Sequence, residues 1–171
     1  LGYETNVFAW EDGAVCKDIA DYFYPISITE HEKILKIAHK IKPVGVISIG
    51  SDLAVRTVNF LALELDLVGN SLNSTKTSTN KYQMRKALLL ANLPCPDFCL
   101  IDDRRITKLI NSNFPLIVKP VDRSGSRGVN KVENYEQLEQ AIRLAVKESF
   151  SKQVIVEEFI NGQEYSMEMM S

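Results

Sequence analysis

The sequence from Phe114 to Val132 reads Phe-Pro-Leu-Ile-Val-Lys-Pro-Val-Asp-Arg-Ser-Gly-Ser-Arg-Gly-Val-Asn-Lys-Val. Its apolar run, Leu116 to Val118, lies between two prolines and predicts a buried strand with sharp ends. A loop rich in glycine and serine follows, and a second β-branched run, Val129 to Val132, leads the chain away. This order predicts a hairpin whose first strand delivers Lys119 to the loop.

The loop has the composition of a phosphate-binding site. Glycine lets backbone N–H groups approach a bound phosphate closely, because no Cβ stands in the way. Serine hydroxyls add hydrogen-bond donors, and the neighbouring lysine and arginine add positive charge. The candidate phosphate ligands are Lys119, Ser124, Gly125, Ser126, Arg127 and Gly128.

Two common phosphate motifs are excluded by the spacing of these glycines. The sequence Gly-x-x-x-x-Gly-Lys-Ser/Thr is absent, so the loop is not a P-loop. The pattern Gly-x-Gly-x-x-Gly is also absent, and strands rather than a helix are expected on both sides, unlike a dinucleotide-binding turn. The loop alone would equally suit an ordinary hairpin whose glycines only form the turn.

A second segment with a distinct pattern begins at Val154. It starts with a predicted buried strand, Val154 to Glu157, and turns at Asn161-Gly162. An alternating strand is predicted from Glu164 to Met169. Alternation would place Glu164, Ser166 and Glu168 on one face of that strand.

Three motifs in this order resemble the ATP-grasp superfamily, and most closely its carbamoyl-phosphate-synthase-like group of carboxylate–amine ligases. The first is Lys119 with its Gly/Ser loop, and the second is Glu157-Glu158-Phe159-Ile160-x-Gly-x-Glu164. The third lies upstream, where Asn80-Lys81-Tyr82-Gln83-Met84-Arg85 opens a helix that ends near Leu93-Pro94-Cys95-Pro96. This third motif resembles the entry to the family's ATP-binding lobe.

The resemblance implies an ATP site and gives each matching residue a role. Lys81 and Lys119 would reach the phosphates, and residues 124–128 would form a mobile flap over the β- and γ-phosphates. Glu157 would accept a hydrogen bond from the adenine amino group, and Glu164 would bind the ribose hydroxyls. The backbone of residues 159–160 would contact the adenine edge. The implied ATP-binding set is Lys81, Lys119, Ser124, Gly125, Ser126, Gly128, Glu157, Glu158, Phe159, Ile160 and Glu164.

Some of these residues also have an ordinary structural interpretation. Glu157 and Glu158 would, without the other motifs, suit a solvated strand end, and Lys81 would suit a helix surface. Lys119 is harder to explain in that way, because a lysine beside a buried strand and a Gly/Ser loop has no packing role. Catalytic residues and the ligands of Mg²⁺ are expected beyond Ser171, and no metal site is predicted in this fragment.

The predicted fold class is α/β, with a partial Rossmann-like (pre-ATP-grasp) domain followed by the first ATP-grasp lobe. The Rossmann-like domain is predicted at residues 1–75 and lacks its first βα unit. The first ATP-grasp lobe is predicted at 76–153. Residues 154–171 would be adenine-hinge strands that open a second lobe, which is cut off.

Within the first domain, the apolar patterns predict three strands and three helices. The third strand is bounded by Pro43 and Gly50-Ser51-Asp52 and is expected to be buried. The predicted strands are Thr5–Trp10, Tyr22–Ile28 and Val44–Ile49, and the predicted helices are Ala14–Ala20, Glu30–Ile41 and Ala54–Leu65.

The polar stretch Ser71 to Asn80 is predicted to be irregular, either as a disordered linker or, with slight preference, as a loop near the nucleotide. A helix capped by Thr79 or Asn80 follows. The elements expected downstream, besides the hairpin, are helix Lys81–Asn92, strand Phe98–Ile101, helix Asp103–Asn111 and the amphipathic helix Tyr135–Phe150.

Composition predicts a soluble, cytoplasmic α/β protein. The formal net charge is −2, and no basic stripe suggests nucleic acid as a partner. The chain shows no signal-peptide pattern and no apolar run long enough to cross a bilayer. The three cysteines do not form a disulfide framework, and Cys95 and Cys99 are poor candidates for zinc. His31 and His39 are expected at the surface. A homo-oligomer is compatible with the sequence.

The expected parent protein is an ATP-dependent ligase that acts on a small carboxylate and an amine, and the fragment by itself is not expected to catalyse. One alternative is a non-catalytic nucleotide-binding or regulatory module with a degenerate second lobe. A structural Rossmann-like interaction domain is a third, but it leaves Lys119, Glu157 and Glu164 unexplained.

Overall fold

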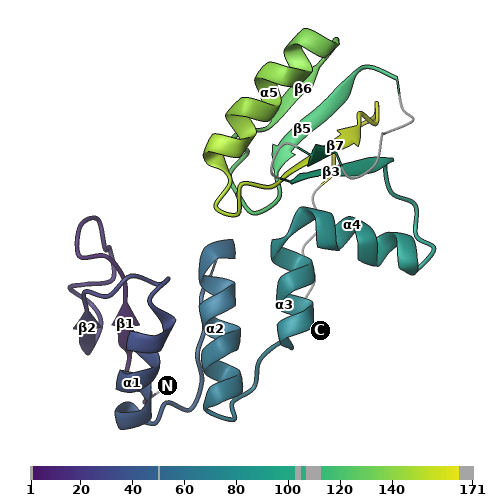
Figure 1. Cartoon of the computed structure of the whole chain (residues 1–171). Coiled ribbons are helices and arrows are strands. Elements are labelled where there is room, and N and C mark those ends of the chain that lie inside the picture. The colour runs from purple at the N-terminus through teal and green to yellow at the C-terminus, as the bar shows by residue number, and fades with distance from the viewer. Residues whose placement is uncertain (1, 50, 103–104, 107–112, 166–171) are drawn as a thin grey trace. The chain divides into compact units, whose positions relative to one another are not determined.

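The computed structural model describes residues 2–49, 51–102, 105–106 and 113–165. The chain divides into two compact units, Leu1–Thr79 and Asn80–Ser171. Most of their elements are labelled in Figure 1, and each unit is described by itself.

The first unit combines a small parallel sheet with helices. β1 (Asn6–Phe8) and β2 (Tyr22–Tyr24) pair in parallel, with Asn6 opposite Tyr22. Its described residues form the helices α1 (His31–Ile41), α2 (Asp52–Glu64) and α3 (Leu72–Thr79). The first two strands and the helices Glu30–Ile41 and Ala54–Leu65 are therefore confirmed, with shifts of a few residues at their ends.

The predicted buried strand Val44–Ile49 is wrong. The segment has no strand assignment, and the side chains of Val44, Ile47 and Ile49 are 82%, 84% and 91% exposed. A strand forms only when its backbone groups pair with a neighbouring strand. None of the described strands of this unit pairs with the segment, so its apolar sequence alone does not make it a strand.

The predicted helix Ala14–Ala20 is also wrong, because these residues form successive turns. The Lys17 N–H donates to the Ala14 carbonyl at 3.1 Å, and the Ala20 N–H donates to the Cys16 carbonyl at 3.1 Å. Val15 and Ile19 are exposed, so the segment has no apolar face buried against the unit. Helix nucleation is unfavourable, and a short segment without such packing does not gain enough stability to form a helix.

The polar stretch predicted to be irregular is helix α3 instead. Its hydroxyls bond within the helix, since Thr75, Thr77 and Thr79 donate to carbonyls four residues earlier at 2.8–2.9 Å. The buried Asn59 of α2 then donates to the Thr75 hydroxyl at 2.7 Å. Residues that favour turns in isolation are thus held in a helix by contacts with α2.

The described strands of the second unit form a sheet with the order β4-β3-β7-β5-β6, in which every pair is antiparallel. The hairpin predicted from Phe114 to Val132 is confirmed, because β5 pairs with β6 and Leu116 lies opposite Val132. β7 lies between β3 and β5. The strands are β3 (Phe98–Asp102), β4 (Arg105–Ile106), β5 (Leu116–Pro120), β6 (Asn130–Val132) and β7 (Val154–Glu158).

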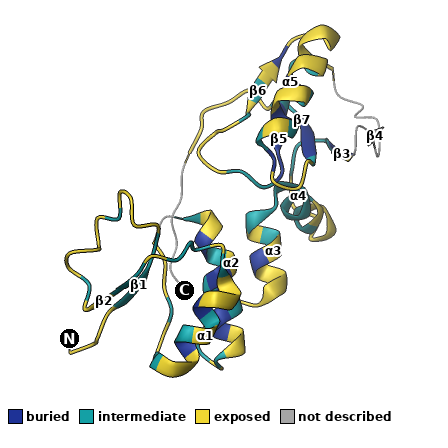
Figure 2. Ribbon diagram, turned by 60° about the vertical axis from the view of Figure 1, so that its left-hand side comes forward, coloured by how far each residue is buried: buried dark blue, intermediate teal, exposed yellow. Residues whose placement is uncertain are grey.

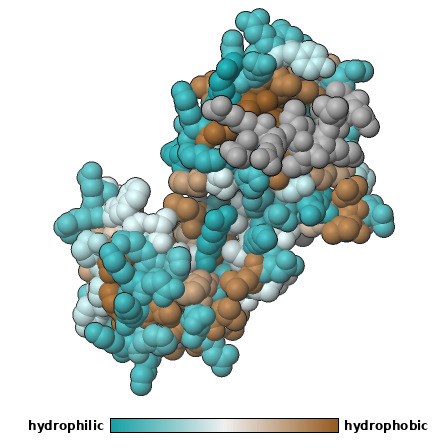
Figure 3. Space-filling view, viewed as in Figure 1, coloured by the Kyte–Doolittle hydropathy of each residue, from teal (hydrophilic) through white to brown (hydrophobic). Residues whose placement is uncertain are grey.

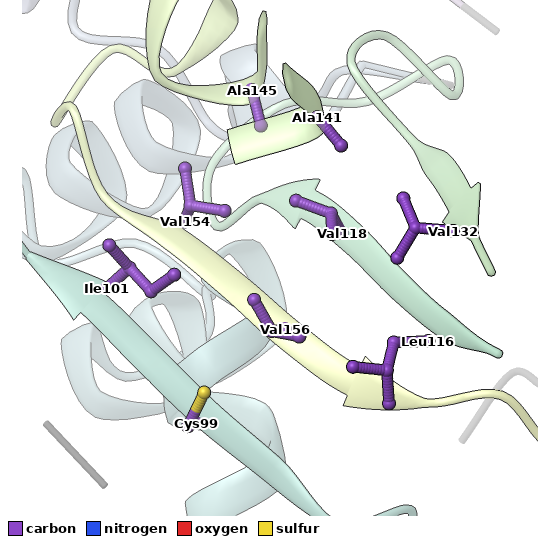
Figure 4. Close-up of a cluster of buried hydrophobic side chains, with 9 residues drawn as sticks. All are labelled: Cys99, Ile101, Leu116, Val118, Val132, Ala141, Ala145, Val154 and Val156. Carbon is purple, nitrogen blue, oxygen red and sulfur yellow. The ribbon is translucent and has the colours of Figure 1, made fainter. Parts of the chain in front are cut away.

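Two helices of this unit pack on opposite faces of the sheet. α5 (Tyr135–Glu148) covers one face, where Ala141 and Ala145 join the largest buried cluster. Figure 4 shows this cluster between α5 and the strands. α4 (Lys81–Leu90) supplies Tyr82 to a smaller cluster around Ile155 on the other face. In Figure 2 the buried residues of this unit concentrate in the strands and on one side of α5.

The predicted helix Asp103–Asn111 is wrong at the two residues that can be checked. Arg105 and Ile106 form β4, which turns back on β3 with Asp102 opposite Arg105. The backbone of the segment pairs with an existing sheet edge, and this overrides a weak helix propensity. The other residues of the predicted helix are not among those that the structure describes.

The strand predicted from Glu164 to Met169 lies mostly outside the described residues. Glu164 and Tyr165 are described, and they are exposed and belong to no strand. The predicted pairing of this segment with β7 is therefore not tested.

The surface carries scattered apolar side chains in both units, and Figure 3 shows hydrophobic patches among hydrophilic ones. Within the described part of the chain, no helix has the length and apolar character needed to cross a membrane.

Candidate functional site

The candidate site begins on the sheet face that α5 does not cover. Side chains alternate along a strand, so Val154 and Val156 of β7 point toward α5 while Ile155 and Glu157 point the other way. In the antiparallel register, Lys119 lies opposite Ile155, and Ile117 lies opposite Glu157. Lys119 and Glu157 are therefore diagonal neighbours on one face, within reach of long side chains.

The Glu157 carboxylate is buried and binds two cations. Glu157 is 3% exposed, and one of its carboxylate oxygens forms an ion pair with the Lys119 ammonium. Arg85 of α4 donates from Nε to the other oxygen at 2.7 Å, and its Nη2 lies 3.5 Å from the oxygen that Lys119 also contacts. We call Arg85, Lys119 and Glu157 the charge cluster. It holds two positive charges and one negative charge, so it carries an excess of positive charge.

Lys81 is placed at the start of the Gly/Ser loop by two bonds. Its backbone N–H donates to the Val121 carbonyl at 2.8 Å, and its ammonium donates to the Arg123 carbonyl. The helix begins here because the Asn80 side chain accepts from the Gln83 N–H at 3.0 Å. Lys81 and Lys119, predicted to act together, thus belong to two elements that meet next to one loop.

The Gly/Ser loop exposes polar groups to solvent, and its end at Gly128 is packed against neighbouring residues. Residues 124–127 are exposed, and Gly125, Ser126 and Gly128 have φ of 63°, 56° and 71°. A Cβ at Gly128 would lie 3.0 Å from Pro120 Cγ and 3.2 Å from Glu148 Cβ, whereas one at Gly125 would meet open space. Gly128 is therefore required for close packing at the end of the loop, and Gly125 only for backbone conformation.

Asp122 fastens the start of the loop to the end of α5. Its carboxylate accepts from the Ser149 hydroxyl at 3.0 Å and from the N–H groups of Phe150 and Ser151 at 3.1 and 2.7 Å. Burial alone would raise the pKa of Asp122, but these hydrogen bonds outweigh burial and lower the pKa from its usual value. The next residue, Arg123, donates to Glu148 at 3.2 Å and stacks over the Phe150 ring.

The predicted adenine-contacting segment follows β7. The Phe159 N–H donates to the Pro115 carbonyl at 3.3 Å, so it is not available for a base edge. The Phe159 ring instead packs under the Lys131 ammonium, which lies 4.2 Å from the ring centroid. Glu158 accepts from the Asp97 N–H at 3.3 Å, and Ile160 is exposed.

The structure thus brings together only part of the predicted set. Lys119 and Glu157 are in contact, and Lys81 contacts the base of the loop formed by Ser124 to Gly128. Between the described residues, no hydrogen bond or ion pair joins Glu164 to either member of the Lys119–Glu157 pair. No group of three His, Cys, Asp or Glu side chains among the described residues is arranged to hold a metal ion.

Two residues of the site were not assigned a role by sequence reasoning. Arg85 lies four residues after Lys81, a spacing that puts both on one side of a helix, and this spacing could have indicated it. Asp122 lies two residues after the end of β5, but nothing in the local sequence shows that the end of α5 supplies its donors.

Comparison with known proteins finds ligases that are similar to parts of this chain. The family model described as "D-ala D-ala ligase C-terminus" matches residues 91–171. A carbamoyl phosphate synthase large chain from Caldanaerobacter subterraneus is 28% identical over 154 residues, which are 88% of this chain and 14% of the relative. A D-alanine–D-alanine ligase from Alcanivorax borkumensis is 32% identical over 108 residues, 63% of this chain and 33% of the relative. The chain therefore spans only a minor part of these relatives.

Solved structures agree with the fold. The L-amino acid ligase from Bacillus licheniformis superimposes with a TM-score of 0.75 at 22% identity, over 94% of this chain and 39% of that protein. The D-alanine–D-alanine ligase from Helicobacter pylori gives a TM-score of 0.54 at 28% identity, over 63% and 33%. These findings confirm the α/β fold class and the resemblance of the chain to the ATP-grasp superfamily.

Proposed function

We propose that this chain is the ATP-binding part of an ATP-dependent ligase that joins a carboxylate to an amine through an acyl phosphate. The observation that carries the proposal is the charge cluster, whose Arg85 lies on the same helix as Lys81, the residue that contacts the base of the Gly/Ser loop. The excess positive charge of the cluster, on a partly buried face, suits a polyphosphate. The relationship to carbamoyl phosphate synthase and D-alanine–D-alanine ligase supports a ligase as the parent protein.

Different residues would then bind the phosphates and the base of the nucleotide. Lys119 and Lys81 would neutralise phosphate charge, and the N–H and hydroxyl groups of residues 124–128, of which 124–127 are exposed, would close over the phosphates. A carboxylate has about four acceptor positions, so Glu157 can accept a further hydrogen bond besides those from Arg85 and Lys119. It would use one of them for the adenine amino group. The carbonyl of Phe159 and the backbone of Ile160 would contact the rest of the base edge.

The proposed reaction has two steps. The carboxylate oxygen of the substrate attacks the γ-phosphorus of ATP, the bond to the β-phosphate oxygen breaks, and ADP leaves. The amine then attacks the acyl carbon, phosphate leaves, and the amine loses a proton. Positioning and charge neutralisation dominate such phosphoryl transfer. Mg²⁺ would neutralise phosphate charge when bound; the resemblance places its ligands beyond Ser171, so none of residues 1–171 is assigned to it.

The proposed organisation follows from the same resemblance. Residues 1–75 would be a pre-ATP-grasp domain, 76–153 the first ATP-grasp lobe, and 154–171 the opening strands of a second lobe. Acidic and asparagine metal ligands downstream of Ser171 in the parent gene would favour a ligase. Their absence would favour a non-catalytic nucleotide-binding module.

The proposed function can be tested in the full-length protein. Calorimetry with ATP in the presence of Mg²⁺ should show binding, and ADP should form when a suitable small carboxylate is added. Hydroxylamine should then trap the acyl phosphate as a hydroxamate. ATP binding without any hydroxamate across a carboxylate panel would contradict the ligase and support the binding module, whereas no ATP binding would contradict both.

A further inference from the structure

We propose that Arg85 is a positioning residue that keeps the Lys119 ammonium available to nucleotide phosphates, by taking up most of the charge of Glu157. This inference rests on the proposed function, because it concerns how the same site binds a polyphosphate. Neither motif reasoning nor the family comparison assigned a role to Arg85.

The contacts around Glu157 show two cations sharing one carboxylate. Arg85 makes the 2.7 Å bond to one oxygen alone, and it approaches the second oxygen at 3.5 Å, where Lys119 is also bound. A guanidinium is planar and can contact both carboxylate oxygens at once, whereas an ammonium is a compact point charge. Arg85 is therefore the partner with the fixed geometry, and Lys119 is the partner that can move.

Burial makes this sharing important. The Glu157 side chain is 4% exposed, and those of Lys119 and Arg85 are 16% and 23% exposed. Away from water, the attraction between opposite charges is much stronger than at an exposed surface. Without Arg85, the carboxylate and Lys119 would form a neutral pair, and a phosphate would have to compete with Glu157 for the ammonium.

With Arg85 present, the carboxylate is already neutralised by a guanidinium. The Lys119 ammonium has three donors and gives only some of them to Glu157. A phosphate approaching from the loop side then meets an excess positive charge. Arg85 thus affects phosphate binding indirectly: it contacts the Glu157 carboxylate, and this contact leaves the Lys119 ammonium available to the phosphate.

A double-mutant cycle in the full-length protein tests this mechanism. The variants are Arg85→Met, Glu157→Gln and the combination of both, and calorimetry measures the Kd for ATP and for adenosine. Arg85→Met should weaken ATP binding about tenfold and adenosine binding less than about twofold, within the range of coupling between contacting residues. In the Glu157→Gln background, Arg85→Met should change ATP affinity by less than about twofold.

Controls separate this role from a structural one. Arg143→Met, at an exposed position of α5 on the other face of the sheet, should leave both affinities unchanged. Arg85→Lys should restore part of the ATP affinity, and it replaces Arg85→Met if thermal unfolding shows that variant to be misfolded. An equal loss for ATP and adenosine, or a loss that persists in Glu157→Gln, would overturn the role of Arg85. A wild-type protein that binds no ATP would overturn the proposed function itself.

Discussion

Lys119 of β5 and Glu157 of β7 form an ion pair across two adjacent antiparallel strands. The register sets this contact, because Lys119 lies opposite Ile155 and Glu157 lies two residues further along β7, on the same face. The motif resemblance gave Lys119 a role at the phosphates, beside the adenine, and gave Glu157 a role at the adenine amino group. The structure shows that each is the other's charge partner, so a change at either residue also alters the electrostatics of the other.

Lys119→Ala should weaken ATP binding by roughly 1–3 kcal/mol, the range for loss of a charge-assisted hydrogen bond. The alanine removes the ammonium but leaves the Glu157 carboxylate paired with Arg85, so the fold should persist. Isothermal titration of the full-length protein with ATP measures the change. Lys147→Ala, at an exposed position of α5, is the matched control and should have no effect. Unchanged affinity in Lys119→Ala would rule out its phosphate role.

Gly128→Ala should destabilise the protein more than Gly125→Ala. Both glycines have positive φ, which costs an alanine roughly 1–2 kcal/mol. Only at Gly128 does the new Cβ also meet Pro120 and Glu148 at 3.0–3.2 Å, and such overpacking adds roughly 1–3 kcal/mol. Urea unfolding measures both. Equal losses at the two positions would show that the end of the loop is not packed as described.

Asp122→Asn should lower stability in a pH-dependent way. The folded-state pKa of Asp122 is lowered, so its contribution is present above the pKa of the unfolded chain, about 3.9, and is lost as pH falls through the folded pKa. Above about pH 5 the variant should lose roughly 1–2 kcal/mol, because hydrogen bonds to a charged acceptor weaken.

The difference between wild type and Asp122→Asn should shrink below about pH 4, as wild-type Asp122 becomes protonated. Denaturant unfolding at several pH values measures this trend. Glu139→Gln, which breaks an exposed pair with Arg143 on α5, is the control and should cost little at any pH. A difference that grows toward low pH would contradict the role of the Asp122 carboxylate as an acceptor.

The local elements of the second unit were predictable because their sequence signals agree with their packing. The hairpin, helix α5 and strand β7 each have an apolar pattern that is buried in the cluster shown in Figure 4. The errors fall where a neighbour decides the outcome. Val44–Ile49 has a strand sequence without a paired strand, and α3 has a turn sequence held by Asn59.

In the candidate site, too, the local contacts could be predicted from the sequence and the nonlocal contacts could not. Lys119 and the Gly/Ser loop are local in sequence, so their association could be inferred directly. Arg85 is 72 residues from Glu157, and the pairing of the two depends on how α4 lies on the sheet. The bonds of Asp122 to the end of α5 are likewise nonlocal. Contacts of this kind are set by tertiary packing, which a single sequence does not display.

Glu164→Gln should impair recognition of the ribose more than recognition of the phosphates. Glu164 lies seven residues after Glu157, is exposed, and is expected from the motif to bind the two ribose hydroxyls. An amide retains one acceptor oxygen, so the loss should be about 1 kcal/mol, the typical net value of a hydrogen bond, and smaller than that of Lys119→Ala. Titration with ATP and with 2′-deoxy-ATP measures it, since the wild type should prefer ATP and the variant should lose that preference. Gln163→Glu moves the carboxylate one position along the chain, and in combination with Glu164→Gln it should not restore discrimination. Wild-type affinities that are equal for the two nucleotides would exclude a ribose contact at Glu164.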